Sequence, residues 1–309
     1  QLACPVTVRE GRQWLNQLVA ERQQQEFFPL PPTPASPTAD SQTAAITPAI
    51  SMSGVWFRYQ QQDEDVLRGV DLQLFPGELL AVMGGNGAGK STMLNAIAGV
   101  WPVDEGQIII DGVDVTKLSE HKRAKYLGRV FQDPMTGTAA TMGIEENLAL
   151  AQRRGQSRTL KIGITKKERE EYKELLKILG LGLENRLTSK VGLLSGGQRQ
   201  ALTLLMATLK KPKLLLLDEH TAALDPKTAA KVLETTDMIV NRDHLTTIMI
   251  THNMKDAIAH GNRLIMLMDG KIILDIKGEE KKKLTVEDLL HQFEKASGEE
   301  FANDRALLS

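Results

Sequence analysis

The segment best suited to chemistry is a glycine-rich stretch that ends in a lysine and two hydroxyl residues. It follows the apolar run 79–83 and precedes a helix-like segment that begins at Met93. Triphosphate oxygens need several inward-pointing backbone N–H groups, and glycine lets the backbone turn tightly and approach them. A helix N-terminus adds partial positive charge. The stretch matches the phosphate-binding pattern G-x-x-x-x-G-K-[ST] and consists of Gly84, Gly85, Asn86, Gly87, Ala88, Gly89, Lys90, Ser91 and Thr92.

Two side chains of this stretch have distinct expected roles. We expect Lys90 to reach the β- and γ-phosphates of ATP, and the Ser91 hydroxyl to bind Mg²⁺. The alternative is a glycine-rich turn that binds no ligand. The apolar strand before the stretch and the helix-like segment after it favour nucleotide binding.

A second candidate site lies where another apolar run, 214–217, ends in Asp218 and Glu219. Carboxylates are costly on a buried strand unless they meet a cation or stay at its solvent-facing end. We expect Asp218 to hold Mg²⁺ through water, and Glu219 to polarise the attacking water as a general base. Many strands end in acidic residues without such a role, so this prediction depends on the glycine-rich stretch in the same chain.

A third motif combines a hydroxyl with two glycines just before the apolar, helix-like segment 201–206. Its backbone amides predict a second helix N-terminus that binds an anion. Alone, a Ser-Gly-Gly sequence is a common way to begin a helix. Here the motif resembles the LSGGQ signature of the ATP-binding-cassette (ABC) ATPases, and it ends 20 residues before Asp218, as in that family. The matching residues are Leu194, Ser195, Gly196, Gly197 and Gln198.

The resemblance covers residues 52–277 and implies roles for four further residues. Tyr59 matches the aromatic residue that stacks on adenine, and Gln132 matches the glutamine that contacts Mg²⁺ or water. Asp225 matches the loop that crosses to the other cassette. His252 matches the histidine that senses the γ-phosphate. The alternatives are that Tyr59 is an ordinary strand aromatic and that His252 is structural or solvated.

Two residues depart from the family pattern. His220 follows Glu219 where the family usually has proline, and Ala222 stands where the crossing loop usually begins with serine. Neither change removes a reacting group. The first predicts an atypical subgroup, and the second removes a hydroxyl from the expected contacts between cassettes.

The elements that position these residues are predicted to form an α/β fold. Alternation over 55–59 predicts one strand, and apolar residues over 70–75 predict another. Continuous apolar runs are typical of buried strands, although a buried helix is the alternative, and helical segments between them predict a largely parallel sheet. Those runs are 79–83, 108–110, 214–217 and 247–250. The resemblance implies a P-loop NTPase with an ABC-type antiparallel β subdomain, a RecA-like core sheet and a helical subdomain.

Composition shifts divide the chain into three parts. We expect residues 1–50 to form a helix and a Pro/Ser/Thr-rich linker, as in the connector that follows one cassette and precedes a second. Residues 51–278 would be the ATPase domain, with its helical subdomain at about 133–200, and residues 279–309 a helical tail packed on it. The charged stretch 153–175 is typical of a solvated helical face.

Composition also narrows the class of function. The chain has 309 residues, of which 41% are hydrophobic and 25% charged, as in ordinary globular proteins. The formal net charge of −1 indicates no affinity for polyanions, so we expect no nucleic-acid partner. The single cysteine, Cys4, excludes an intramolecular disulfide and favours the cytoplasm. No apolar stretch reaches the roughly 18 residues of a membrane span.

The resemblance implies the ATP-hydrolysing motor subunit of an ABC transporter. Two cassettes, identical or different, would enclose ATP between them. Together they would drive solute transport, import rather than export, through a separate integral-membrane permease at the inner face of the cell membrane. A solute-binding protein would be a further partner. The alternatives are a soluble ABC ATPase with an assembly or regulatory role and a nucleotide-binding scaffold without turnover.

Overall fold

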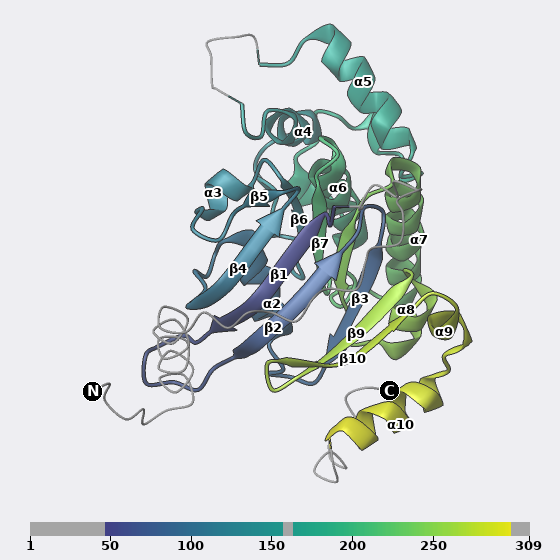
Figure 1. Ribbon diagram of the computed structural model, residues 1–309. Coiled ribbons are helices and arrows are strands. Elements are labelled where there is room, and N and C mark those ends of the chain that lie inside the picture. Colours follow the sequence, from purple (N-terminus) through teal and green to yellow (C-terminus); the bar gives the residue numbers. More distant parts are fainter. Residues whose placement is uncertain (1–46, 157–162, 298–309) are drawn as a thin grey trace, which may run out of the picture. The chain divides into compact units, whose positions relative to one another are not determined.

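The computed structural model describes residues 47–156 and 163–297 (Figure 1). The helix and linker predicted for residues 1–50 therefore lie almost entirely outside the described residues, as does the end of the predicted tail. The domain boundaries given above stay predictions.

The core is a six-stranded sheet with the order β10-β9-β3-β8-β7-β6. All neighbouring pairs except β10 and β9 are parallel, which matches the expectation of a largely parallel sheet. The strands are β3 (Leu79–Gly84), β6 (Leu127–Val130), β7 (Leu214–Asp218), β8 (Thr247–Ile250), β9 (Arg263–Met268) and β10 (Lys271–Lys277).

Alternate residues of these core strands enter two different hydrophobic cores. On β3, Leu80 and Val82 pack in a core with residues of helix α2 and of a second sheet, whereas Ala81 and Met83 pack in a core with residues of α4 to α7. Because both faces of the sheet are covered, every position on these strands favours an apolar residue. This explains the continuous apolar runs in the sequence.

The second sheet is antiparallel, with the order β2-β1-β4-β5. Its strands are β1 (Ile50–Phe57), β2 (Leu67–Leu74), β4 (Glu105–Ile110) and β5 (Val113–Asp114). Two expectations were wrong here. The run 108–110 belongs to this sheet rather than to the parallel one, and its residue Ile109 is partly exposed while both neighbours are buried. Tyr59 lies beyond β1, which ends two residues earlier.

Helices lie between successive core strands from β3 to β9, as the sequence predicted, and further helices follow β10. They are α2 (Lys90–Ala98), α3 (Glu120–Arg123), α4 (Ile144–Gln152), α5 (Lys166–Lys177), α6 (Gly196–Thr208), α7 (Pro226–Asp243), α8 (Met254–Ala259), α9 (Glu279–Lys283) and α10 (Val286–Ser297). Helix α5 is largely exposed and carries ion pairs between residues three or four apart, so a solvated face in the charged stretch is confirmed. Among the described helices, none is long and apolar enough to span a bilayer.

The C-terminal elements are fixed to the core sheet by apolar and polar contacts. Leu289 and Phe293 of α10 are buried and join the core that contains α4 to α7. The Lys281 ammonium on α9 donates to three backbone carbonyls at the end of α8, including Ile258 O at 3.0 Å and His260 O at 2.7 Å. The expectation of an amphipathic terminal helix packed on the domain is confirmed.

Truncating the side chain that fixes α10 should lower stability measurably. Leu289 is fully buried, so Leu289→Ala should reduce the free energy of unfolding by about 3 kcal/mol through lost burial and the cavity left behind. The matched control is Leu290→Ala, because Leu290 is only partly buried and should cost less. Chemical denaturation would measure both values. Equal losses in the two variants would contradict the specific packing of Leu289.

Candidate nucleotide site

The polar residues predicted to act together lie at one edge of the core sheet. Strands β3, β8 and β7 are parallel neighbours, with Val82 opposite Ile250 and Asp218 also opposite Ile250. Their carboxyl ends therefore meet at the same edge. The glycine-rich loop follows β3, His252 follows β8, and the acidic pair closes β7.

The glycine-rich loop folds around the lysine that follows it. The Lys90 ammonium donates to Gly84 O at 2.7 Å and to Gly85 O at 2.9 Å, and the side chain is mostly buried. Burial lowers the pKa of Lys90, while the charges of Glu219 and Asp218 act to raise it. The lysine thus lies inside the loop, next to the acidic strand end.

The glycines of the loop serve two different requirements. Gly84, Gly87 and Gly89 all have positive φ, which favours glycine. A Cβ at Gly84 would overlap Leu267 O of the neighbouring strand, so close packing excludes a side chain there. A Cβ at Gly87 would meet nothing within 4 Å. The loop is therefore packed on the sheet at one end and open at its middle, and such an open, amide-rich turn suits phosphate oxygens.

Two predicted metal ligands face each other across the loop. The Ser91 hydroxyl on α2 donates to Asp218 Oδ1 at the end of β7, at 3.4 Å. Burial raises the pKa of Asp218, whereas the Arg129 guanidinium, 3.6 Å from Oδ2, acts to lower it. Hydroxyl and carboxylate oxygens are the donors that Mg²⁺ prefers, so these two residues fit the expected ion.

The two residues expected to act on the γ-phosphate and its attacking water are neighbours. His252 Nδ1 lies 3.1 Å from Glu219 Oε1. Glu219 has a left-handed backbone with φ 45°, which is unusual for a residue with a side chain, and its N–H donates to Ile250 O at 3.1 Å. This backbone conformation directs the chain away from the sheet immediately after Asp218.

Tyr59 belongs to an aromatic group next to the start of α2. Its ring meets Phe57 and Trp101 edge to face, with centroids 5.1 Å and 5.6 Å away, and it is 54% exposed. Its hydroxyl lies 3.0 Å from the Thr92 hydroxyl on α2. The position suits an adenine platform, and that role stays a prediction.

The signature turn is built as a helix N-cap. Ser195 Oγ accepts from Gln198 N at 3.3 Å, and the Gln198 side chain accepts from Ser195 N at 3.2 Å, so the two residues cap α6 reciprocally. A Cβ at Gly197 would overlap Thr228 of α7. Among the described residues, no hydrogen bond or ion pair joins this turn to the phosphate loop. The turn is thus preformed but separate from the rest of the site.

The remaining two predicted residues lie on loops at the ends of strands or helices. Gln132 is exposed and follows β6, whose residue Val130 pairs with Leu217, so it lies at the same sheet edge as Asp218. Asp225 caps α7, because its Oδ1 accepts from Thr228 N at 3.1 Å. Hydrogen bonds from the Thr228 hydroxyl and from the Thr228 N–H lower the pKa of Asp225. Their roles in catalysis and in contacts between cassettes stay predictions.

Sequence reasoning missed one charged residue of the site, Arg129. A lone arginine within the apolar strand β6 was the available signal, because a buried charge needs a partner. From the sequence, His220 was recognised only as a departure from the ABC family pattern. In the structure His220 is buried behind the acidic pair, and its Nε2 lies 3.1 Å from Thr236 Oγ1 on α7. The Thr236 hydroxyl already donates to Val232 O, so His220 Nε2 is the donor in this bond.

The fold and these motifs define a P-loop ATPase of the cassette type. Comparisons with known proteins agree with this class. The ABC transporter family model matches residues 67–222. A tyrosine transport ATP-binding protein of Clostridioides difficile is 47% identical over 231 residues, which cover 75% of this chain and 92% of that protein. The methionine import ATP-binding protein MetN of Bartonella henselae is 36% identical over 213 residues, or 67% of this chain and 58% of that protein.

Solved structures give the same result. The ATP-binding cassette MJ0796, a dimer in a post-hydrolysis state with ADP and phosphate, superposes with a TM-score of 0.63 at 29% identity, covering 74% of this chain and 98% of that one. The chain therefore belongs to the ABC transporter family of ATP-binding proteins. The expected fold class and the expected activity, ATP hydrolysis, are confirmed.

The buried His220 makes stability depend on pH in a defined window. Burial lowers its pKa to about 4, from 6.5. Between these values the unfolded chain takes up a proton at His220 and the folded chain does not, so stability falls as the pH is lowered. His220→Gln keeps an amide donor for Thr236 but cannot titrate. Urea denaturation at pH 7 and pH 5 should show that acidification destabilises the variant less, by about 2 kcal/mol.

Charged neighbours provide the control for this measurement. His260 and Asp237 also face this region, and the hydrogen bond that His260 Nδ1 donates to Asp237 Oδ2 raises the pKa of His260. His260→Gln removes a proton site that stabilises the folded chain at low pH, so it should make acid destabilisation larger rather than smaller. The same pH response in His220→Gln and the unmodified chain would show that His220 does not stay neutral in the folded state.

Proposed function

We propose that this chain is the motor subunit of an ABC importer and that its residues act in the roles predicted from the sequence. The observation that carries the proposal is the meeting, at one sheet edge, of a lysine-filled phosphate loop, a hydroxyl–carboxylate pair and a glutamate–histidine pair. ABC family membership supports the same assignment.

In this proposal the chain's own residues divide the work of hydrolysis. Lys90 leaves the carbonyls of Gly84 and Gly85 to bind the β- and γ-phosphates. Ser91 and Asp218 would hold Mg²⁺, with Gln132 contributing, and the ion would supply positive charge to offset the charge of the phosphates. Glu219 accepts a proton from the attacking water, and its neighbour His252 contacts the γ-phosphate.

Half of the proposed site comes from a second cassette. The signature turn has free-standing N-cap geometry and no polar link to the phosphate loop within the described part of its own chain. Ser195 and the following glycine amides would therefore bind the γ-phosphate held by the partner. The dimeric state of the similar cassette MJ0796 supports this arrangement. ATP favours the closed pair because these contacts exist only in that state.

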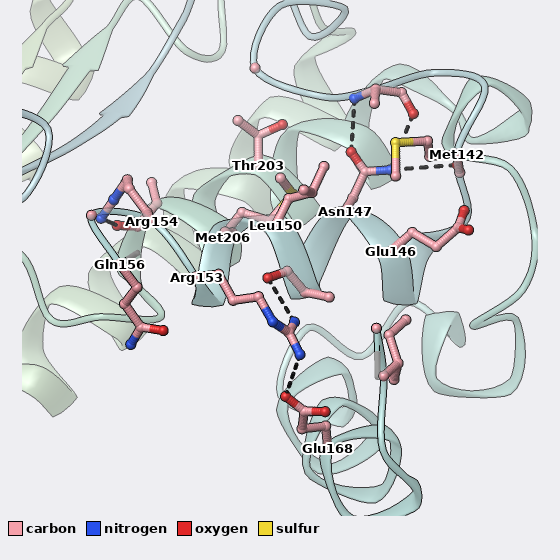
Figure 2. A pocket seen from close by; sticks show the side chains of 18 of the residues that line it. Met142, Glu146, Asn147, Leu150, Arg153, Arg154, Gln156, Glu168, Thr203 and Met206 are labelled. Carbon is pink, nitrogen blue, oxygen red and sulfur yellow. Dashed lines mark hydrogen bonds and ion pairs between the residues drawn. The ribbon is translucent and has the colours of Figure 1, made fainter. Parts of the chain in front are cut away.

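A cavity on the helical side of the chain is a suitable docking place for a permease. Its volume is about 1720 Å³, and it lies between α4, α6 and the segments around residues 137–142 and 163–165. Figure 2 shows Leu150 and Met206 facing it, with Arg153 paired to Glu168 at 2.8 Å. An apolar groove edged by charges suits an amphipathic helix. The segment from 137 leads back to Gln132, which would connect docking to the nucleotide site.

The proposed direction of transport and the proposed cargo are inferred from the names of similar proteins. A tyrosine transport protein at 47% identity and two methionine import proteins support import of a small amino acid-like solute. A bacitracin export protein at 29% identity represents the opposite direction at lower similarity. A membrane-associated position follows from the permease, which together with a solute-binding protein would carry the cargo. Uptake of labelled tyrosine by cells with and without the chain would test this part.

Replacing the proposed general base should separate binding from turnover. Glu219→Gln keeps the size of the side chain but accepts no proton, so ATP hydrolysis should fall at least about 100-fold. Nucleotide binding should persist, and ATP should stabilise a closed dimer. Phosphate release, equilibrium binding and light scattering would measure the three quantities.

Two controls make this result specific. Glu234→Gln changes an exposed glutamate on α7 that pairs with Lys231, and it should hydrolyse ATP normally. Lys90→Ala should lose ATP binding itself. Full hydrolysis by Glu219→Gln would remove Glu219 from its proposed role.

A charge placed in the cavity should weaken permease binding. Leu150 is 54% exposed and faces the cavity, so Leu150→Glu should reduce co-purification with the permease at least about tenfold through burial of an unpaired charge. Met238→Glu is the matched control, because Met238 is an exposed apolar residue on α7 that does not line the cavity. Undiminished co-purification of Leu150→Glu with the permease would show that the permease docks at another surface. Absence of any membrane partner would favour the soluble ABC ATPase.

A further inference from the structure

Arg129 connects three parts of the candidate nucleotide site. Its Nη2 donates to Asn95 Oδ1 on α2 at 2.7 Å and lies 3.6 Å from Asp218 Oδ2. Its guanidinium lies over the Phe131 ring, 4.5 Å from the centroid. Only 14% of the side chain is exposed. A cation so enclosed stays charged because Asp218 and the ring compensate for its lost hydration.

The two oxygens of the Asp218 carboxylate face different partners. Oδ1 accepts from Ser91, on the side where the metal ligands meet, and Oδ2 faces Arg129. The positive charge of Arg129 therefore lies against the carboxylate oxygen that does not face Ser91. A fixed positive charge this close also repels a divalent cation at the other oxygen.

The same guanidinium also contacts the segment that leads to the helical side of the chain. Phe131, on which the guanidinium lies, accepts a hydrogen bond at its carbonyl from Gln200 Nε2 on α6, at 3.0 Å. Gln132 is the next residue. Arg129 also contributes to the lining of the cavity beside α4 and α6. A shift of the guanidinium therefore changes packing at the segment that joins the two regions.

We propose that Arg129 is a positioning residue that acts as a resident counter-cation of Asp218. It lies against Oδ2 of the carboxylate and lowers the affinity of the site for Mg²⁺ by competing for the same carboxylate. If Asp218 turned to hold Mg²⁺, its attraction for Arg129 would weaken, and the contact of the guanidinium with Phe131 would change. This inference rests on the proposed nucleotide site.

The test is a Mg²⁺ titration of ATP binding to the full chain, followed with a fluorescent ATP analogue. Arg129→Gln removes the charge and keeps an amide that can reach Asn95. The free Mg²⁺ concentration at half-maximal binding should fall about fivefold, because a repulsive charge has been removed. Arg129→Lys keeps the charge and should stay within about twofold of the unmodified chain. An unchanged or higher midpoint in Arg129→Gln would overturn the proposal.

A second variant should shift the Mg²⁺ midpoint in the opposite direction, and it keeps the buried charge of Arg129. Asn95→Ala removes the hydrogen-bond acceptor of Arg129 Nη2 at a position in helix α2, where alanine is well tolerated. The guanidinium is then left to Asp218, so the Mg²⁺ midpoint should rise. This variant tests the proposal even if Arg129→Gln does not fold, and a lower midpoint would contradict it.

The matched control is Arg153→Gln, which removes a charge from the same cavity lining but from a residue paired with Glu168. Its Mg²⁺ midpoint should not move. An equal shift in Arg153→Gln would show that losing any positive charge from this region has the same effect, and it would overturn the proposal. The proposed nucleotide site fails separately, when the unmodified chain does not bind Mg-ATP or when Lys90→Ala binds it normally.

Discussion

Both faces of the core sheet are covered by hydrophobic cores, and in strands β3, β7 and β8 this burial leaves charged residues only at or beyond the strand ends. Leu214 to Leu217 enter these cores alternately, and the first carboxylate follows only where the strand reaches the edge. Because β3, β8 and β7 run in parallel and in register, their carboxyl ends lie side by side. The same constraint that makes the strands apolar therefore collects the loop, the acidic pair and His252 in one place.

The sequence alone predicts those parts of the site whose residues lie close together along the chain. A buried strand, a tight glycine turn and a helix start are all encoded within a dozen residues around Lys90, so this part of the site could be predicted closely. Pairing between distant strands has no such local signal. The run 108–110 has the same apolar character as the core strands, but Ile109 is partly exposed, which is the alternation of an antiparallel sheet. Arg129 was missed for a related reason: its partner lies on a neighbouring strand that is distant in sequence.

The signature turn and the crossing loop form one packed unit, although they have separate motifs. Gly197 has no space for a side chain because Thr228 lies against it, and the Thr228 N–H is the donor that Asp225 accepts. A displacement of α6 must therefore be shared by the start of α7. On its other side α6 is tied to Phe131 through Gln200. These contacts provide a continuous physical route between the proposed partner-facing residues and the cavity.

The position of Glu219 is maintained differently from the family pattern, and this has an energetic consequence. A left-handed backbone at a residue with a side chain costs roughly 1–2 kcal/mol, so neighbouring structure must maintain it. A proline at the next position restricts the residue before it through its own ring. Here His220 has no such ring constraint, and burial together with the bond to Thr236 anchors the chain instead. Burial disfavours a charged imidazole at this position, so acidification opposes the packing of His220 against α7, and in this chain the geometry of the proposed base is linked to that packing at low pH.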